Sequence, residues 1–134
     1  MKLNENQFKE IDEIGYVILP GWFSNEEVKN IQKEMITVFK EKTEANVVEK
    51  SSGEVRTAMG LHLRSKLFDD LTRHPKFFEP ARQLRGDNLY IQQTKINVKA
   101  AFTGEVWQWH YDFATHFGED GVPKPLALNL HVFL

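Results

Sequence analysis

The chain has no cysteine, no large excess of charge of one sign and no long hydrophobic run. The absence of cysteine excludes a disulfide framework and any thiolate metal site, which leaves histidine and carboxylate side chains as the strong metal ligands. The 17 basic and 19 acidic residues give a formal net charge of -2, which argues against nucleic acid or an anionic membrane as a partner. No segment approaches the ~20 apolar residues of a membrane span, and the start lacks a signal peptide, so we expect a cytoplasmic protein.

A length of 134 residues with 41% hydrophobic side chains predicts one domain over residues 1–134, mostly helical up to residue 86. Asn4 is a good N-cap for a first helix, which Gly15 ends. Ser24 followed by Glu27 fits a capping box that opens a second helix. A proline suits the first turn of a third predicted helix. The predicted helices cover residues 4–14, 24–41 and 75–86.

Alternating apolar and polar residues predict strands in the last third of the chain, residues 87–134. Over residues 89–98, one face carries Gln93, Lys95 and Asn97 and turns polar midway. This polar face is the first functional hint, although the solvated face of an edge strand gives the same pattern. The other predicted strands cover residues 16–19, 55–60, 106–110 and 126–134, and we expect a loop over residues 42–53.

His110 and Asp112 form a His-x-Asp triplet at the end of an apolar strand flanked by Trp107, Trp109 and Phe113. Alternation places the imidazole and the carboxylate on one strand face, so both can reach one metal ion. With a second histidine they would form the 2-His-1-carboxylate triad, which leaves positions on Fe(II) open. A strand-end histidine bonded to its own surroundings gives the same triplet. Tryptophans at such positions are more often core than substrate platforms.

Several blocks occur in one order along the chain: Gln93 to Asn97, Thr103-Gly104, Trp109-His110-x-Asp112 and Glu119-Asp120-Gly121-x-Pro123. In this they resemble the phytanoyl-CoA dioxygenase family of Fe(II)/2-oxoglutarate oxygenases, in its ectoine hydroxylase and proline trans-4-hydroxylase branch. The resemblance implies a mainly β fold with N-terminal helices, the double-stranded β-helix or cupin-like jelly roll. Residues 87–134 would supply its first core strands.

The resemblance also implies an activity, with Fe(II), 2-oxoglutarate and O2 as cofactors. The expected reaction hydroxylates an unactivated C–H of a small, amino-acid-like substrate and decarboxylates 2-oxoglutarate to succinate. By position in the family pattern, catalysis and iron binding fall to His110 and Asp112, 2-oxoglutarate binding to Asn97, Asn129 and Met59, and substrate binding to Gln93, His116, Lys95, Arg56 and Trp109.

The chain departs from this family pattern beyond the triplet. His116 and His131 follow Asp112 too closely to be the distal iron ligand, and no arginine follows Arg85 to pair with the far carboxylate of 2-oxoglutarate. His116 also replaces a tryptophan of the ectoine hydroxylase pattern, which makes ectoine a doubtful substrate. We therefore expect a missing C-terminal half to supply the third ligand and the anchor.

An alternative function class follows from the same departures. The chain would then be an inactive or truncated jelly-roll fragment that binds a second segment to complete its fold, because a half-built sheet exposes apolar side chains and unpaired edges. The expected partners are a small-molecule substrate and either a second copy of the chain or the missing C-terminal segment.

Overall fold

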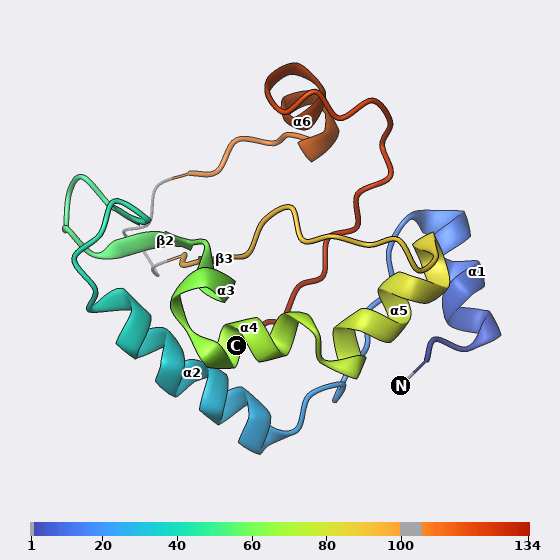
Figure 1. Ribbon diagram of the computed structural model, residues 1–134, viewed down its shortest axis with the longest axis horizontal. Coiled ribbons are helices and arrows are strands. Elements are labelled where there is room, and N and C mark those ends of the chain that lie inside the picture. Colours follow the sequence, from blue (N-terminus) through green and yellow to red (C-terminus); the bar gives the residue numbers. More distant parts are fainter. Residues whose placement is uncertain (1, 100–105) are drawn as a thin grey trace.

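The computed structural model describes residues 2–99 and 106–134, which form six helices and three short strands (Figure 1). Within this part of the chain helices prevail over strands, and the β part of the expected fold is present there only as one small antiparallel sheet. The turn predicted at Thr103 and Gly104 lies outside the described residues. In chain order the elements are α1 (Glu5–Ile14), α2 (Asn25–Phe39), β1 (Asn46–Val48), β2 (Val55–Met59), α3 (Leu61–Arg64), α4 (Lys66–Thr72), α5 (Pro75–Arg85), β3 (Lys95–Asn97) and α6 (Asp112–Glu119).

The predicted ends of the first helices are confirmed. Asn4 caps α1 by accepting from the backbone N–H of Gln7 at 3.0 Å, and Gly15 ends it with a φ of 87°, which glycine adopts without steric cost. The capping box of Ser24 and Glu27 opens α2. The third predicted helix corresponds to α5, whose first residue is Pro75. None of the helices in the described ranges is both long enough and apolar enough to cross a membrane.

The strands form one antiparallel sheet in the order β1-β2-β3. The strand predicted over residues 55–60 is confirmed as β2, but the one predicted over residues 89–98 forms only at β3, and the expected loop contains β1. No strand forms at residues 16–19, 106–110 or 126–134, so those predictions are wrong. Alternation shows which side chains share a face, whereas a strand also needs a neighbour to accept and donate its ladder hydrogen bonds.

The core lies where α2, β2, α3 and α4 meet, and Figure 1 shows these elements together at one end of the molecule. Ile31 and Val38 of α2 are buried against Ala58 of β2, Leu61 of α3 and Phe68 of α4. The apolar stripe of α2 therefore packs on the centre of the sheet and on the two short helices, and this packing fixes the position of β2.

The Arg64 guanidinium links four parts of this core. It donates to the carbonyl of Met59 at 3.0 Å, to the carbonyl of Val38 at 3.2 Å and to Asn46 Oδ1 at 2.9 Å. It also forms an ion pair with Glu41 at 2.7 Å, and only 12% of its side chain is exposed. Carbonyls at the end of a helix or a strand often lack a regular partner, and here the planar fork of one arginine provides donors to one at each of these ends.

Replacing Arg64 by alanine is expected to destabilise the protein by about 3 kcal/mol, since a half-buried ion pair and its carbonyl partners are broken together. Arg64→Lys should recover only part of this loss, because an ammonium group cannot reproduce the fork. The measurement is urea unfolding. Arg73→Ala is the control: its ion pairs with Asp69 and Asp70 lie on the surface, with 65% of the arginine side chain exposed, and the expected cost is below about 1 kcal/mol. Equal effects of the two alanine variants would contradict the role of Arg64.

Candidate functional site

The side chains of His110 and Asp112 lie together at the start of α6. His110 Nε2 is 3.4 Å from Asp112 Oδ1, and both side chains are partly exposed. Asp112 is the first residue of a helix, so the prediction that the pair lies on one face at the end of a strand is wrong, although the two groups do face each other. A separation of 3.4 Å allows both atoms to contact one ion with metal–ligand bonds of about 2.1 Å.

The hydrogen bond on the other ring nitrogen determines the tautomer of His110. Nδ1 lies 2.7 Å from the carbonyl oxygen of Gln108, and because a carbonyl only accepts, Nδ1 carries the proton. The neutral ring then has its lone pair on Nε2, the nitrogen that faces Asp112. This is the arrangement in which a backbone carbonyl orients a metal-binding histidine.

Asp112 is held ionised by its neighbours. Asn129 Nδ2 donates to Asp112 Oδ2 at 2.7 Å, and this hydrogen bond is the largest cause of a pKa below the ordinary value of 3.8. Burial opposes the shift, while the charge of Lys95 adds to it. Since Asn129 occupies Oδ2, the second oxygen, Oδ1, is the one directed at His110.

A small cavity of about 180 Å³ adjoins Asp112. Asp112, His116 and Asn129 provide polar walls, and Phe113 and Val122 are among the apolar ones. At about 30 Å³ for each water molecule this volume holds roughly six waters, which is enough for a small ligand.

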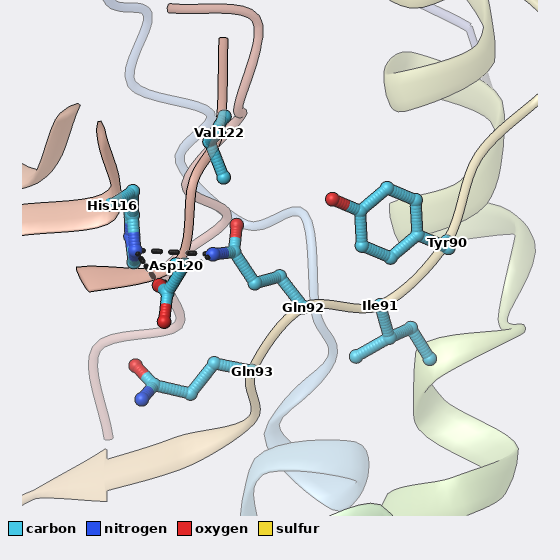
Figure 2. Close-up of a pocket in the computed structure, with 7 residues that line it drawn as sticks. All are labelled: Tyr90, Ile91, Gln92, Gln93, His116, Asp120 and Val122. Carbon is cyan, nitrogen blue, oxygen red and sulfur yellow. Dashed lines mark hydrogen bonds and ion pairs between the residues drawn. The ribbon is translucent and has the colours of Figure 1, made fainter. Parts of the chain in front are cut away.

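A larger cavity of about 390 Å³ lies on the other side of His116. Figure 2 shows the Gln92 side chain reaching towards His116 and Asp120, with Tyr90 facing the same space. His116 Nδ1 is 2.7 Å from Asp120 Oδ2, and Gln92 Nε2 is 3.1 Å from the same oxygen. Gln93 also lines this cavity, and His116 and Val122 line both cavities.

The remaining predicted site residues lie on or beside the sheet. Met59 pairs with Lys95 across β2 and β3, while Asn97 Oδ1 accepts from the hydroxyl of Thr57 at 3.2 Å. The guanidinium of Arg56 stacks 4.1 Å from the ring centroid of a tryptophan, Trp107. The residues Arg56, Met59, Asn97 and Trp109 line neither of the two cavities described above.

The prediction of buried tryptophans is wrong for the described part of the chain. Trp109 is fully exposed and Trp107 is exposed over 40% of its surface, against Arg56. Residues 106–110 form no strand, so these rings are not placed on the inner face of a sheet, and Trp107 is covered in part by Arg56 of β2. Within residues 2–99 and 106–134, no three histidine, aspartate or glutamate side chains come close enough together to hold a metal ion.

Sequence reasoning missed Gln92 and Asp120. Alternation placed Gln92 on the face opposite Gln93, yet both line the larger cavity because residues 89–94 are not in a strand. A signal for Asp120 does exist: His116 and Asp120 are four residues apart, the spacing that brings side chains together on a helix. It went unused because no helix was predicted over residues 112–119.

Comparison with known proteins gives a consistent set of relatives. The sequence model of the PhyH family, phytanoyl-CoA dioxygenase, matches residues 11–134. An ectoine dioxygenase of Bordetella bronchiseptica is 32% identical over 136 residues, which cover 98% of this chain and 44% of that protein. An L-proline trans-4-hydroxylase of Streptomyces griseoviridis is 34% identical over 120 residues, covering 90% and 45%. The chain thus spans less than half the length of these relatives.

A solved structure matches as well. The crystal structure of EctD from S. alaskensis with 2-oxoglutarate and 5-hydroxyectoine aligns with a TM-score of 0.84 at 32% identity, covering 91% of this chain and 45% of that one. EctD from S. alaskensis with bound Fe aligns with a TM-score of 0.79 at 30% identity. The arrangement of helices and of the small sheet is therefore that of part of the EctD structure.

Replacing Asn129 by alanine is expected to raise the pKa of Asp112 towards its ordinary value of 3.8, because the largest cause of the lowering is lost. NMR titration of the Asp112 carboxyl carbon measures this pKa. Lys95→Gln is the matched comparison and should raise it less, since the charge of Lys95 contributes less than the hydrogen bond. A larger rise in Lys95→Gln than in Asn129→Ala would contradict this ranking.

Proposed function

The chain belongs to the phytanoyl-CoA dioxygenase family, and on that premise we propose that the full-length protein is an Fe(II)- and 2-oxoglutarate-dependent hydroxylase. Its substrate would be small and amino-acid-like, as the names of the ectoine and proline relatives suggest. The products would be a hydroxylated substrate, succinate and CO2. The jelly roll is the proposed architecture of the whole protein, with residues 1–134 as its N-terminal portion.

The observation that carries the proposal is the convergence of His110 Nε2 and Asp112 Oδ1, 3.4 Å apart. One imidazole nitrogen and one carboxylate oxygen are two of the three donors in the 2-His-1-carboxylate set used by Fe(II) oxygenases, so the residues present fit the metal. The third donor and a cation for the far carboxylate of 2-oxoglutarate would come from a further segment or a second copy of the chain.

Each residue at the site then has a defined task. When bound, the iron and 2-oxoglutarate supply the activation of O2 for C–H oxidation. Asn129 fixes the rotamer of Asp112 so that Oδ1 stays available to the metal, and the Gln108 carbonyl does the same for His110 Nε2. The apolar wall of the small cavity, including Phe113, limits water beside the reacting C–H bond.

Among the residues expected to bind the small molecules, the geometry favours some over others. Gln93 and His116 line the larger cavity and are proposed substrate residues. The charge of Lys95 helps to lower the pKa of Asp112, and Asn129 donates a hydrogen bond to the Asp112 carboxylate. Assigning 2-oxoglutarate to Asn97 and Met59, and substrate to Arg56 and Trp109, still depends on the family pattern alone.

A second candidate function is an interaction module that binds a complementary segment. It is favoured by the exposed aromatic side chains of the C-terminal region, among them Trp109, Tyr111 and Phe133, the last exposed over 91% of its surface. A contiguous patch of such side chains would mark a surface that another chain covers. An oxygenase completed by a further segment would also bury them.

Anaerobic titration with Fe(II) and 2-oxoglutarate tests the proposed function. The longest protein encoded by the gene should develop the weak visible charge-transfer band of 2-oxoglutarate chelated to Fe(II), and the Asp112→Ala variant should lose it. Glu119→Gln removes a carboxylate from the same helix, outside both cavities, and should keep the band. Absence of the band from the unaltered protein would overturn the iron site and favour the interaction module.

A further inference from the structure

We propose that the larger cavity binds the cationic nitrogen of a zwitterionic substrate, through Asp120 and His116. This inference rests on the proposed function and narrows its substrate class. The cavity has a volume of about 390 Å³, and its lining includes one carboxylate, Asp120, with no lysine or arginine among the described residues. The amide groups of Gln92 and Gln93 and the Tyr90 hydroxyl are its other polar groups. Such a lining attracts a cation and disfavours a second anion.

The hydrogen bonds around Asp120 show which nitrogen of His116 faces the carboxylate. A carboxylate only accepts, so the 2.7 Å contact between His116 Nδ1 and Asp120 Oδ2 places a proton on Nδ1. Gln92 Nε2 lies 3.0 Å from the same Nδ1, but two donors cannot bond to each other. The Gln92 amide proton is therefore donated to Asp120 Oδ2, at 3.1 Å.

This arrangement leaves an acceptor for a ligand. Oδ1 of Asp120 makes no hydrogen bond to the described residues. A protonated amine carries N–H donors and a positive charge, so it can satisfy this carboxylate oxygen with a charge-assisted hydrogen bond. Gln92 is a positioning residue here, because it acts by holding the carboxylate.

The position of His116 connects this cavity to the proposed iron site. His116 and Val122 line both the larger cavity and the small one, which contains Asp112. A small substrate whose nitrogen is held beside Asp120 can therefore place its carbon skeleton past His116, towards Asp112. The pair His116 and Asp120 would thus select substrates that have a cationic nitrogen a short distance from the carbon that reacts.

Binding to the full-length protein without iron is the first test. L-Proline and ectoine, zwitterions with a cationic nitrogen, are the cationic probes, and cyclopentanecarboxylate, in which carbon replaces the proline nitrogen, is the control that keeps only the carboxylate. At least one cationic probe is expected to bind about tenfold or more tightly than the control and to shift the ring nitrogen resonances of His116 in NMR spectra. If neither binds better than cyclopentanecarboxylate, the proposal is wrong.

Variants of single residues show which side chains bind the probe. Asp120→Asn should weaken binding of the cationic probe about tenfold and raise its KM with little change in kcat, while Asp120→Glu restores part of the affinity. Gln92→Leu, which leaves the carboxylate in place, should cause a smaller loss. Glu119→Gln removes the neighbouring charge outside the cavity and should bind as the unaltered protein does.

The two proposals fail separately. Probe binding that depends on Asp120, in a protein without the charge-transfer band, would overturn the iron proposal and support this one. A normal band together with equal probe binding in Asp120→Asn and Glu119→Gln would overturn this inference and leave the iron proposal standing.

Discussion

The guanidinium of Arg64 is the contact on which the order of this fold depends. It bonds to a carbonyl in the last turn of α2, that of Val38, to the last carbonyl of β2, that of Met59, and to the Asn46 side chain in β1. The Val38 carbonyl also accepts from the N–H of Glu41 and from the Asn46 amide, so the loss of Arg64 would fall mainly on the Met59 carbonyl and on Glu41, and a partly buried polar group that loses its partner costs more than the hydrogen bond itself contributes. The ion pair with Glu41 balances the charge, so one side chain closes the junction of helix and sheet.

The junction of helix and sheet is connected to the candidate site through β3, which pairs with β2. Met59, whose carbonyl Arg64 holds, pairs with Lys95, and the next N–H along, that of Gly60, donates to the carbonyl of Thr94 at 2.9 Å. His62 Nδ1 lies 2.7 Å from the Thr94 hydroxyl. These contacts fix the chain immediately before β3. They thereby determine the positions of Gln92 and Gln93, which precede β3 and line the larger cavity. The register of a three-residue strand thus positions side chains of the proposed substrate site.

How much was predictable from the sequence follows from the range of each interaction. The caps at Asn4 and Ser24 involve residues three positions apart, so a local pattern contained all the partners, and these predictions are confirmed. The strand over residues 126–134 needed a distant partner, and alternation carries no information about one. The same limit explains why Trp109 was expected in a core and is exposed.

In the candidate site, too, contacts between residues close in sequence were predictable and contacts between distant residues were not. His110 and Asp112 were found because two residues apart in an extended chain share a face, and their donor atoms do converge. Helix α6 was missed, since no element was predicted over its residues, and the pairing of His116 with Asp120 was missed with it. The link between Gln92 and Asp120 spans 28 residues and joins segments whose relation no short pattern encodes.

The two histidine–carboxylate pairs of this region have the same chemical groups and differ in how each ring is held. A backbone carbonyl fixes Nδ1 of His110, so Nε2 and the Asp112 carboxylate converge and both can donate electron pairs to one cation. In the second pair the carboxylate of Asp120 itself accepts a hydrogen bond from Nδ1 of His116. A metal ion could bind both groups only after the proton between them had left. The first pair therefore suits a metal ion and the second an organic cation that brings its own N–H donors. Since His116 lines both cavities, recognition of the substrate nitrogen and reaction at a nearby carbon can be coupled through one side chain.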